Sequence, residues 1–363
     1  MRTAGVTITV AALALAVAAA QTPAPRPAPG KGAIPRTSDG RPDLQGNWTN
    51  ATITPLERLQ AGSLVISDEA ALEMEASTAR ALAFRERDSD PDREAPPVGG
   101  ELRKSPNAQP TFIERLWQAG AGTVGGYNSF WIDPGERVLR VDGQPRSSII
   151  IDPPDGRVPA YTPEARARIA EAAARRKALG SEFDHPELRP LGERCLTSFG
   201  NNAGPPMLPN YFYNNNYTIV QTKDAVMILS EMVHDARIVR IGGQHPPATV
   251  RFWFGDSIGR WEGDTLVIET TNFLPQHGFR NSWEHLKVTE RLRRVDAATI
   301  NYRFTVEDPA TFTAPFTGEL VFNAMAPGEH VYEYACHEGN YGLEGVLSGA
   351  RAQEREAAKK PQP

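Results

Sequence analysis

The sequence predicts an all-β protein whose antiparallel meander closes into a barrel or a strongly curved sheet, with two peripheral helices and an irregular N-terminal arm. Short β-rich runs recur along the chain, turn residues separate them, and the run 299–306 alternates between apolar and polar side chains. In this run Ile300, Tyr302, Phe304 and Val306 share one face. Such a strand is buried on one side and exposed to solvent on the other.

The N-terminal residues are typical of an exported protein. Arg2 supplies a positive charge, residues 6–17 form a compact apolar run, and Ala18 to Ala20 make a small-residue cleavage site before Gln21. We therefore expect a signal peptide over 1–20 and a periplasmic or secreted mature protein. The apolar run is shorter than the roughly 20 residues that a membrane span needs, so we expect no membrane span.

The rest of the chain divides by composition. Proline, alanine and glycine dominate residues 21–43, which predicts a flexible linker. A single β-barrel-like domain with helical insertions is expected over 44–350, followed by a charged C-terminal tail over 351–363.

Two helices are expected at the periphery. Ser67 is a suitable N-cap for a helix that runs to about Ala83. Thr162 as N-cap with Pro163 at the first position predicts a second helix, which ends at Gly180. The charged, proline-containing segment 85–104 predicts a surface loop.

The predicted strands are short and follow one another closely. Tight turns at 222–224, 260–264 and 295–297 join several of them. The full set is 129–132, 137–141, 148–151, 217–222, 226–233, 237–241, 250–254, 265–271, 286–292, 299–306, 319–322 and 330–335.

Cys195 and Cys336 are the only cysteines. Because an exported chain meets an oxidising compartment, an even number of cysteines favours a disulfide between them. Two buried thiols are the first alternative, and a nucleophilic Cys336 beside His337 is the second.

The charge balance argues against strongly anionic partners. Thirty-nine basic and 44 acidic residues give a net charge of −5, so neither nucleic acid nor an anionic membrane surface is an expected partner. The chain has no nucleophile elbow, Walker loop or dinucleotide fingerprint.

Three carboxylates occur where alternation predicts apolar neighbours: Glu231, Glu290 and Glu333. Burial raises the pKa of a carboxyl group toward the range in which it works as a general acid. The alternatives are an internal salt bridge to Arg237, Arg251 or Arg291, or a register that differs by one residue.

Histidines and tyrosines add candidate site residues. His234, His285 and His337 lie at predicted strand ends and could converge at one barrel mouth, but no pair has a metal-ligand spacing, so we assign no metal and no cofactor. His234, Arg237 and Tyr334 are expected to polarise or position a substrate. Aromatic rings near amides suit sugar-like or planar ligands, and the expected binding residues are Tyr213, Asn215, Trp253, Tyr334 and Tyr341.

The sequence blocks 152–157, 231–238, 261–267, 305–309 and 332–341 together resemble a family of secreted bacterial proteins of unassigned activity. This resemblance covers roughly 127–351; it implies export and carries over no catalytic residue. The triplet Gly46-Asn47-Trp48 is similar to the start of lipocalin-like barrels, which implies a lipocalin-like barrel with a ligand cavity. The long helical insertion at Thr162 departs from that family's compact form.

These observations lead to one preferred function and two alternatives. We expect an exported protein that binds a small sugar-like or aromatic molecule at a barrel mouth and performs acid–base chemistry on it, as a lyase, isomerase or hydrolase. Glu231, Glu290 and His337 are the expected acids or bases. The alternatives are a non-catalytic periplasmic carrier of an apolar or aromatic ligand and an envelope protein that binds a partner.

Overall fold

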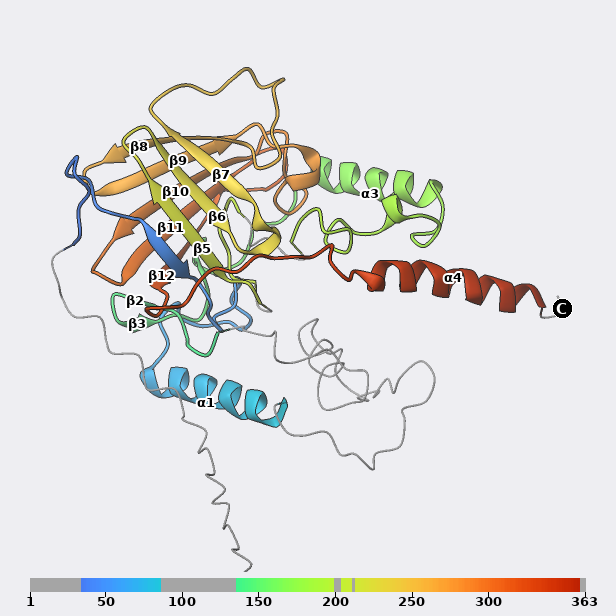
Figure 1. Ribbon diagram of the computed structural model, residues 1–363, viewed down its shortest axis with the longest axis horizontal. Coiled ribbons are helices and arrows are strands. Elements are labelled where there is room, and N and C mark those ends of the chain that lie inside the picture. Colours follow the sequence, from blue (N-terminus) through green and yellow to red (C-terminus); the bar gives the residue numbers. More distant parts are fainter. Residues whose placement is uncertain (1–33, 86–134, 199–203, 211–212, 360–363) are drawn as a thin grey trace, which may run out of the picture.

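The computed structural model describes residues 34–85, 135–198, 204–210 and 213–359. Within them, nine strands form a closed barrel, because β1 pairs with both β5 and β12 (Figure 1). The all-β fold expected from the sequence is therefore confirmed. The barrel strands are β1 (Gly46–Thr49), β5 (Asn216–Gln221), β6 (Ala225–Ser230), β7 (Ala236–Ile241), β8 (Asp256–Glu262), β9 (Thr265–Thr271), β10 (Lys287–Arg294), β11 (Thr299–Glu307) and β12 (Phe316–Ala324).

Neighbouring strands run antiparallel except at one seam. β7 and β8 are parallel, with Val239 opposite Ser257, so the chain must return along the barrel between them. Residues 242–255 make this return, and we call them the crossover loop. The short strand β4 (Ile150–Asp152) adds to β12 outside the closed ring, and β2 (Arg140–Val141) pairs with β3 (Gln144–Pro145).

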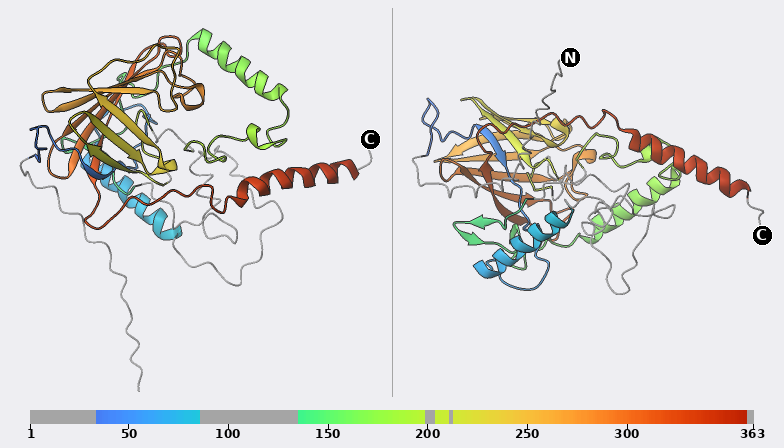
Figure 2. Two further views of the ribbon diagram at one scale, coloured as in Figure 1. Left: turned by 45° about the horizontal axis from the view of Figure 1, so that its top comes forward. Right: turned by 60° about the horizontal axis from the view of Figure 1, so that its bottom comes forward.

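In the described part of the chain, three α-helices lie outside the barrel (Figures 1 and 2). The first two were expected: α1 (Asp68–Arg85) has Ser67 at its N-cap, and in α3 (Pro163–Ala178) the Thr162 side chain accepts a hydrogen bond from Ala165. The third, α4 (Tyr341–Lys359), was not expected, and the predicted tail that starts at 351 begins inside it. Single 3-10 turns occur at η2 (Pro186–Leu188), η3 (Met232–His234) and η4 (Pro275–His277). None of the helices in the described ranges combines the length and apolar character that a bilayer crossing needs.

Two of the predicted strands are wrong. Residues 250–254 belong to the crossover loop, where Phe252 makes a single bridge to Phe273, and the strand lies instead at 256–262. Residues 330–335 are not a strand either, because β1 already completes the barrel and leaves β12 no free edge there. The predicted strand 129–132, the loop 85–104 beyond its first residue, the signal peptide and most of the linker lie outside the described residues.

The hydrophobic core fills the inside of the barrel. Inward-facing side chains of every barrel strand contribute, and large rings such as Trp48, Phe304 and Phe322 are almost completely buried. A barrel of this strand number is about wide enough for side chains to fill. Any ligand therefore has to be sought at the ends of the barrel.

One end is sealed by the segment before β1. Leu44 donates its amide hydrogen to the Gln221 side chain, and Arg294 binds the carbonyl oxygen of Asp43. The Arg294 guanidinium lies over the ring of Trp48, 5.1 Å from the ring centre. The opposite end, where β5, β7 and β8 begin, lies near α3, and we call it the α3 end.

Candidate functional site

A layer of polar side chains crosses the barrel interior near the α3 end. Strands with otherwise apolar inner faces each contribute one of these buried groups, which indicates that the layer is a distinct feature of the fold. Its members are Tyr217, Ser230, Arg237, Ser257, Thr270, Glu290 and Tyr302.

The centre of this layer is an ion pair across the barrel. Both guanidinium ends of Arg237 donate to the Glu290 carboxylate, one of them from Nη2 to Oε1 at 2.9 Å. The Tyr302 hydroxyl donates to the same carboxylate at 2.8 Å. Burial is the largest single effect on the pKa of Arg237 and would lower it, but the charge and the hydrogen bonds of Glu290, together with the two tyrosines, raise the pKa overall. The salt bridge to Arg237, one of the alternatives for Glu290, is therefore what the structure contains.

A buried segment, 204–210, closes the layer from above. The Met207 amide donates to Tyr302 at 2.9 Å, the Asn50 side chain donates to the Met207 carbonyl oxygen, and His277 Nε2 lies 3.1 Å from the Gly204 carbonyl oxygen. Burial raises the pKa of Tyr302 well above its ordinary value and lowers the pKa of His277. Both groups are therefore neutral at pH 7.

Directly above the layer, residues 231–235 turn the chain from β6 into β7. We call them the corner. Glu231 is buried, and its carboxylate accepts a hydrogen bond from Asn216 at 2.9 Å. Burial raises the pKa of Glu231, and hydrogen bonds from Asn216 and Asn214 offset part of that rise. Because β6 ends at Ser230, Glu231 does not continue the alternation that the sequence predicts for it.

Asp235 is the second carboxylate of the corner. Its Oδ2 is buried and has no hydrogen-bond partner in the described part of the chain. Burial raises its pKa from 3.8 to about 6, against a smaller lowering by the His234 charge. The corner thus carries two carboxyl groups with raised pKa values, one of them near neutrality.

The backbone of the corner is strained. Val233 and His234 have φ angles of +65° and +49°, in the left-handed region. That region is costly for a β-branched residue such as valine. Strain of this kind often accompanies functional sites, and here it directly precedes Asp235.

The segment between β12 and α4, residues 325–340, which we call the strap, passes over the corner (Figure 1). His234 Nδ1 lies 3.0 Å from the carbonyl oxygen of Tyr334, and the ring of Tyr334 stacks on Tyr213 with 6.4 Å between centres. The predicted disulfide between Cys195 and Cys336 is confirmed and anchors the strap.

The structure brings some predicted site residues together and separates others. Glu231, His234, Tyr213 and Tyr334 meet at the corner. The other predicted residues lie elsewhere. Asn215 is buried and forms hydrogen bonds with the backbone of Asn210, and Trp253 of the crossover loop packs near His277. Tyr341 begins α4 and is 78% exposed, and Glu333, His285 and His337 are exposed as well. The His337 ring makes no hydrogen bond or ion pair with any described residue.

Sequence reasoning did not select Asp235 as a site residue. It also missed Tyr302, although this tyrosine shares a face with Ile300 and Phe304 and its hydroxyl needs a buried partner. The buried carboxylate of Glu290, on the neighbouring strand β10, likewise needs a hydrogen-bond partner. The sequence pattern could therefore have paired Tyr302 with Glu290.

No group of three or more histidine, cysteine or carboxylate side chains is placed to share a metal ion within the described ranges, so His234, His285 and His337 do not form such a group. Comparison of the chain with models of known families, with curated proteins and with solved structures finds no match.

Proposed function

We propose that the protein binds a small hydroxyl-bearing molecule at the α3 end of the barrel and performs acid–base chemistry on it with the corner carboxylates. Asp235 carries the proposal, because it combines a buried, unpartnered oxygen with a pKa of about 6. A carboxyl group with a pKa near the working pH both gives and takes protons efficiently. Glu231, four residues earlier, supplies a second proton carrier in the same turn.

The unpartnered groups at the α3 end support a polar ligand. Four polar side chains there, those of Asn50, Asn210, Ser230 and Asp235, each have a buried atom without a hydrogen-bond partner among the described residues. Buried polar atoms normally find partners in protein, water or ligand. At least Asn50 Oδ1 and Asp235 Oδ2 are acceptors, which favours a ligand that donates hydrogen bonds, such as a polyol or a sugar.

Aromatic rings beside the corner fit the same ligand class. The stacked pair of Tyr213 and Tyr334 presents ring faces next to His234, and such faces bind sugar or planar rings. The packed barrel interior leads us to prefer this site over carriage of an apolar ligand inside the barrel. Export to the periplasm is part of the proposal and is supported by the disulfide.

Ligand binding and turnover test the proposal. Wild-type protein is screened by thermal shift against monosaccharides, sugar acids and phenolic acids, and hits are followed by NMR for turnover between pH 5 and 8. We expect Asp235→Asn to bind the ligand and to lose about 100-fold or more in turnover, as loss of an acid–base group does. Asp224→Asn, the same change at an exposed turn carboxylate, is the control.

The outcomes separate the alternatives. Binding without turnover by the wild-type protein would indicate a carrier. Turnover that survives both Asp235→Asn and Glu231→Gln would show that the corner carboxylates are not the acid and base.

The raised pKa of Asp235 also predicts how stability depends on pH. The folded state holds this proton up to about pH 6, whereas the unfolded chain releases it near pH 3.8. The folded state therefore binds more protons between these values, and the free energy of unfolding should fall as pH rises from about 4 to about 6.

Asp235→Asn should remove this part of the pH dependence and stabilise the protein above pH 6. Urea unfolding followed by circular dichroism at pH 4, 5, 6 and 7 measures it, with Asp224→Asn as control. A variant whose stability follows the wild-type pH curve would contradict the prediction.

A further inference from the structure

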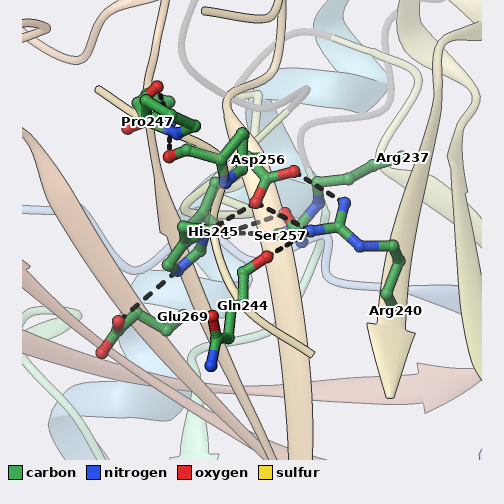
Figure 3. Close-up of polar contacts among 11 residues, drawn as sticks. Arg237, Arg240, Gln244, His245, Pro247, Asp256, Ser257 and Glu269 are labelled. Atoms are coloured by element: carbon green, nitrogen blue, oxygen red, sulfur yellow. Dashed lines mark hydrogen bonds and ion pairs between the residues drawn. The ribbon is translucent and has the colours of Figure 1, made fainter. Parts of the chain in front are cut away.

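A second polar cluster lies on the outer wall of the barrel, beside the start of β8 (Figure 3). Asp256, the first residue of β8, is almost completely buried. Its carboxylate accepts two hydrogen bonds from Arg240, at 2.7 and 3.0 Å, and lies 2.6 Å from Nδ1 of His245. The two hydrogen bonds from the Arg240 guanidinium favour the ionised form of this carboxylate.

The crossover loop holds His245 in place. Gly242 and Gly243 begin this loop with φ angles of +72° and +112°. After the histidine, the Asn272 side chain donates to the carbonyl oxygens of Pro246 and Pro247 at 3.1 and 3.4 Å. The imidazole is therefore fixed from its backbone as well as from Asp256.

This arrangement determines the state of the imidazole. An ionised Asp256 only accepts hydrogen bonds, so Nδ1 of His245 carries the proton and Nε2 keeps its lone pair when the ring is neutral. Nε2 is buried, has no hydrogen-bond partner in the described part of the chain, and lies 3.5 Å from Oε1 of Glu269. Two electron-pair donors that face each other in this way call for a positive charge between them.

The distance favours a metal ion over a proton. A proton shared between imidazole and carboxylate would draw the two atoms to about 2.7–2.9 Å. Two ligands of a tetrahedral zinc ion at about 2.1 Å each lie ~3.4 Å apart, which matches the separation of Nε2 and Oε1.

We infer that His245 and Glu269 bind a divalent cation of the zinc type, with Asp256 orienting the imidazole from behind. A histidine ligand whose other ring nitrogen donates to a carboxylate is a common support for such ions. Arg240 neutralises Asp256. Lys287 interacts electrostatically with Glu269 but forms its ion pair with Glu307, at 2.7 Å. Two protein ligands leave the other coordination positions to solvent, so the ion exchanges readily.

Calorimetric titration of the full chain with zinc chloride at pH 7, after removal of metals with a chelator, tests the site. We expect one zinc ion per chain at this site, at least tenfold weaker binding in His245→Ala and in Glu269→Gln, and 10- to 100-fold weaker binding in Asp256→Asn. His285→Ala, which removes an exposed histidine outside the cluster, should bind zinc as the wild type does. Far-UV circular dichroism checks the fold of each variant.

A second readout observes the proposed ligand atom directly. The imidazole nitrogen resonances of ¹⁵N-labelled wild-type protein should show Nε2 of one histidine, assigned to His245 with the alanine variant, shifting when zinc is added. The inference is overturned if the wild type binds no zinc, if His245→Ala and Glu269→Gln bind it undiminished, or if Nε2 of His245 stays protonated at pH 7 in the presence of zinc.

Discussion

Replacing Arg237 by methionine is expected to lower the free energy of unfolding by about 3–5 kcal/mol, because it leaves the Glu290 carboxylate charged and buried without its partner. The side chain of Glu290 is 0% exposed, so water cannot replace the guanidinium. The Tyr302 hydroxyl would remain as a donor to the carboxylate. Chemical denaturation at pH 7, followed by circular dichroism, measures the loss.

The matched control lies one residue from Glu290. Arg291, on the outer face of β10, pairs with Glu262 at 2.8 Å, and both side chains are about 40% exposed. Since exposed ion pairs contribute little, Arg291→Met should change stability by less than about 1 kcal/mol. Equal losses in the two variants would contradict the account of the Arg237 pair.

The double variant Arg237→Met/Glu290→Leu distinguishes the effect of losing the ion pair from the effect of leaving the Glu290 charge unpaired. Removing both charges from the interior should restore most of the stability that the single change costs, because neither group then remains unpaired. If the double variant is as unstable as Arg237→Met, the loss comes from packing and not from the unpaired carboxylate.

The alternation of apolar and polar side chains predicted the strands that bury one face, and it failed for strands whose packing does not produce this pattern. The strand β8 contains Asp256, Gly259 and Arg260 and has few apolar residues, so no pattern marks it. Gly259 is needed there because a Cβ atom would lie 2.9 Å from side-chain atoms of both Ile241 and Val239. The bulky residues 250–254 just before it look more like a strand, but they serve the crossover loop.

The unexpected helix and the strap have a similar explanation. Helix α4 contains Gly342, Gly345 and Gly349, which weaken a helix prediction. The strap segment 330–335 alternates like a strand, but the pairing of β1 with β12 leaves it no edge to join. Closure of the barrel is a long-range event that a local pattern does not encode.

The same limit applies to the site. Alternation placed Glu290 among apolar neighbours and therefore required a buried partner, with Arg237 among the three arginines considered. The choice among them depends on the barrel, because β7 and β10 are separated by two strands and meet only across the interior. Alternation does not mark Asp235 as buried, because the left-handed residues Val233 and His234 that precede it depart from strand geometry.

The double variant Cys195→Ser/Cys336→Ser is expected to lose about 5 kcal/mol of unfolding free energy. The bridge spans 141 residues, and the chain-entropy model assigns about this stabilisation to a closed loop of that length. Urea unfolding of the variant, and of the wild type with and without reductant, measures it. Wild-type protein in reductant should match the variant, because both lack only the cross-link.

The disulfide also gives a readout at the corner. Without it, nothing covalent holds the strap near Cys195, although Asn340 still donates to the carbonyl oxygen of Glu193 at 3.2 Å. We expect the contact between Tyr334 and Tyr213 to loosen, with faster amide exchange in the strap, while the β10 and β11 amides keep their protection under native conditions. A variant with wild-type stability and unchanged strap exchange would show that packing alone fixes the strap, and that the bridge is not what orders this side of the proposed site.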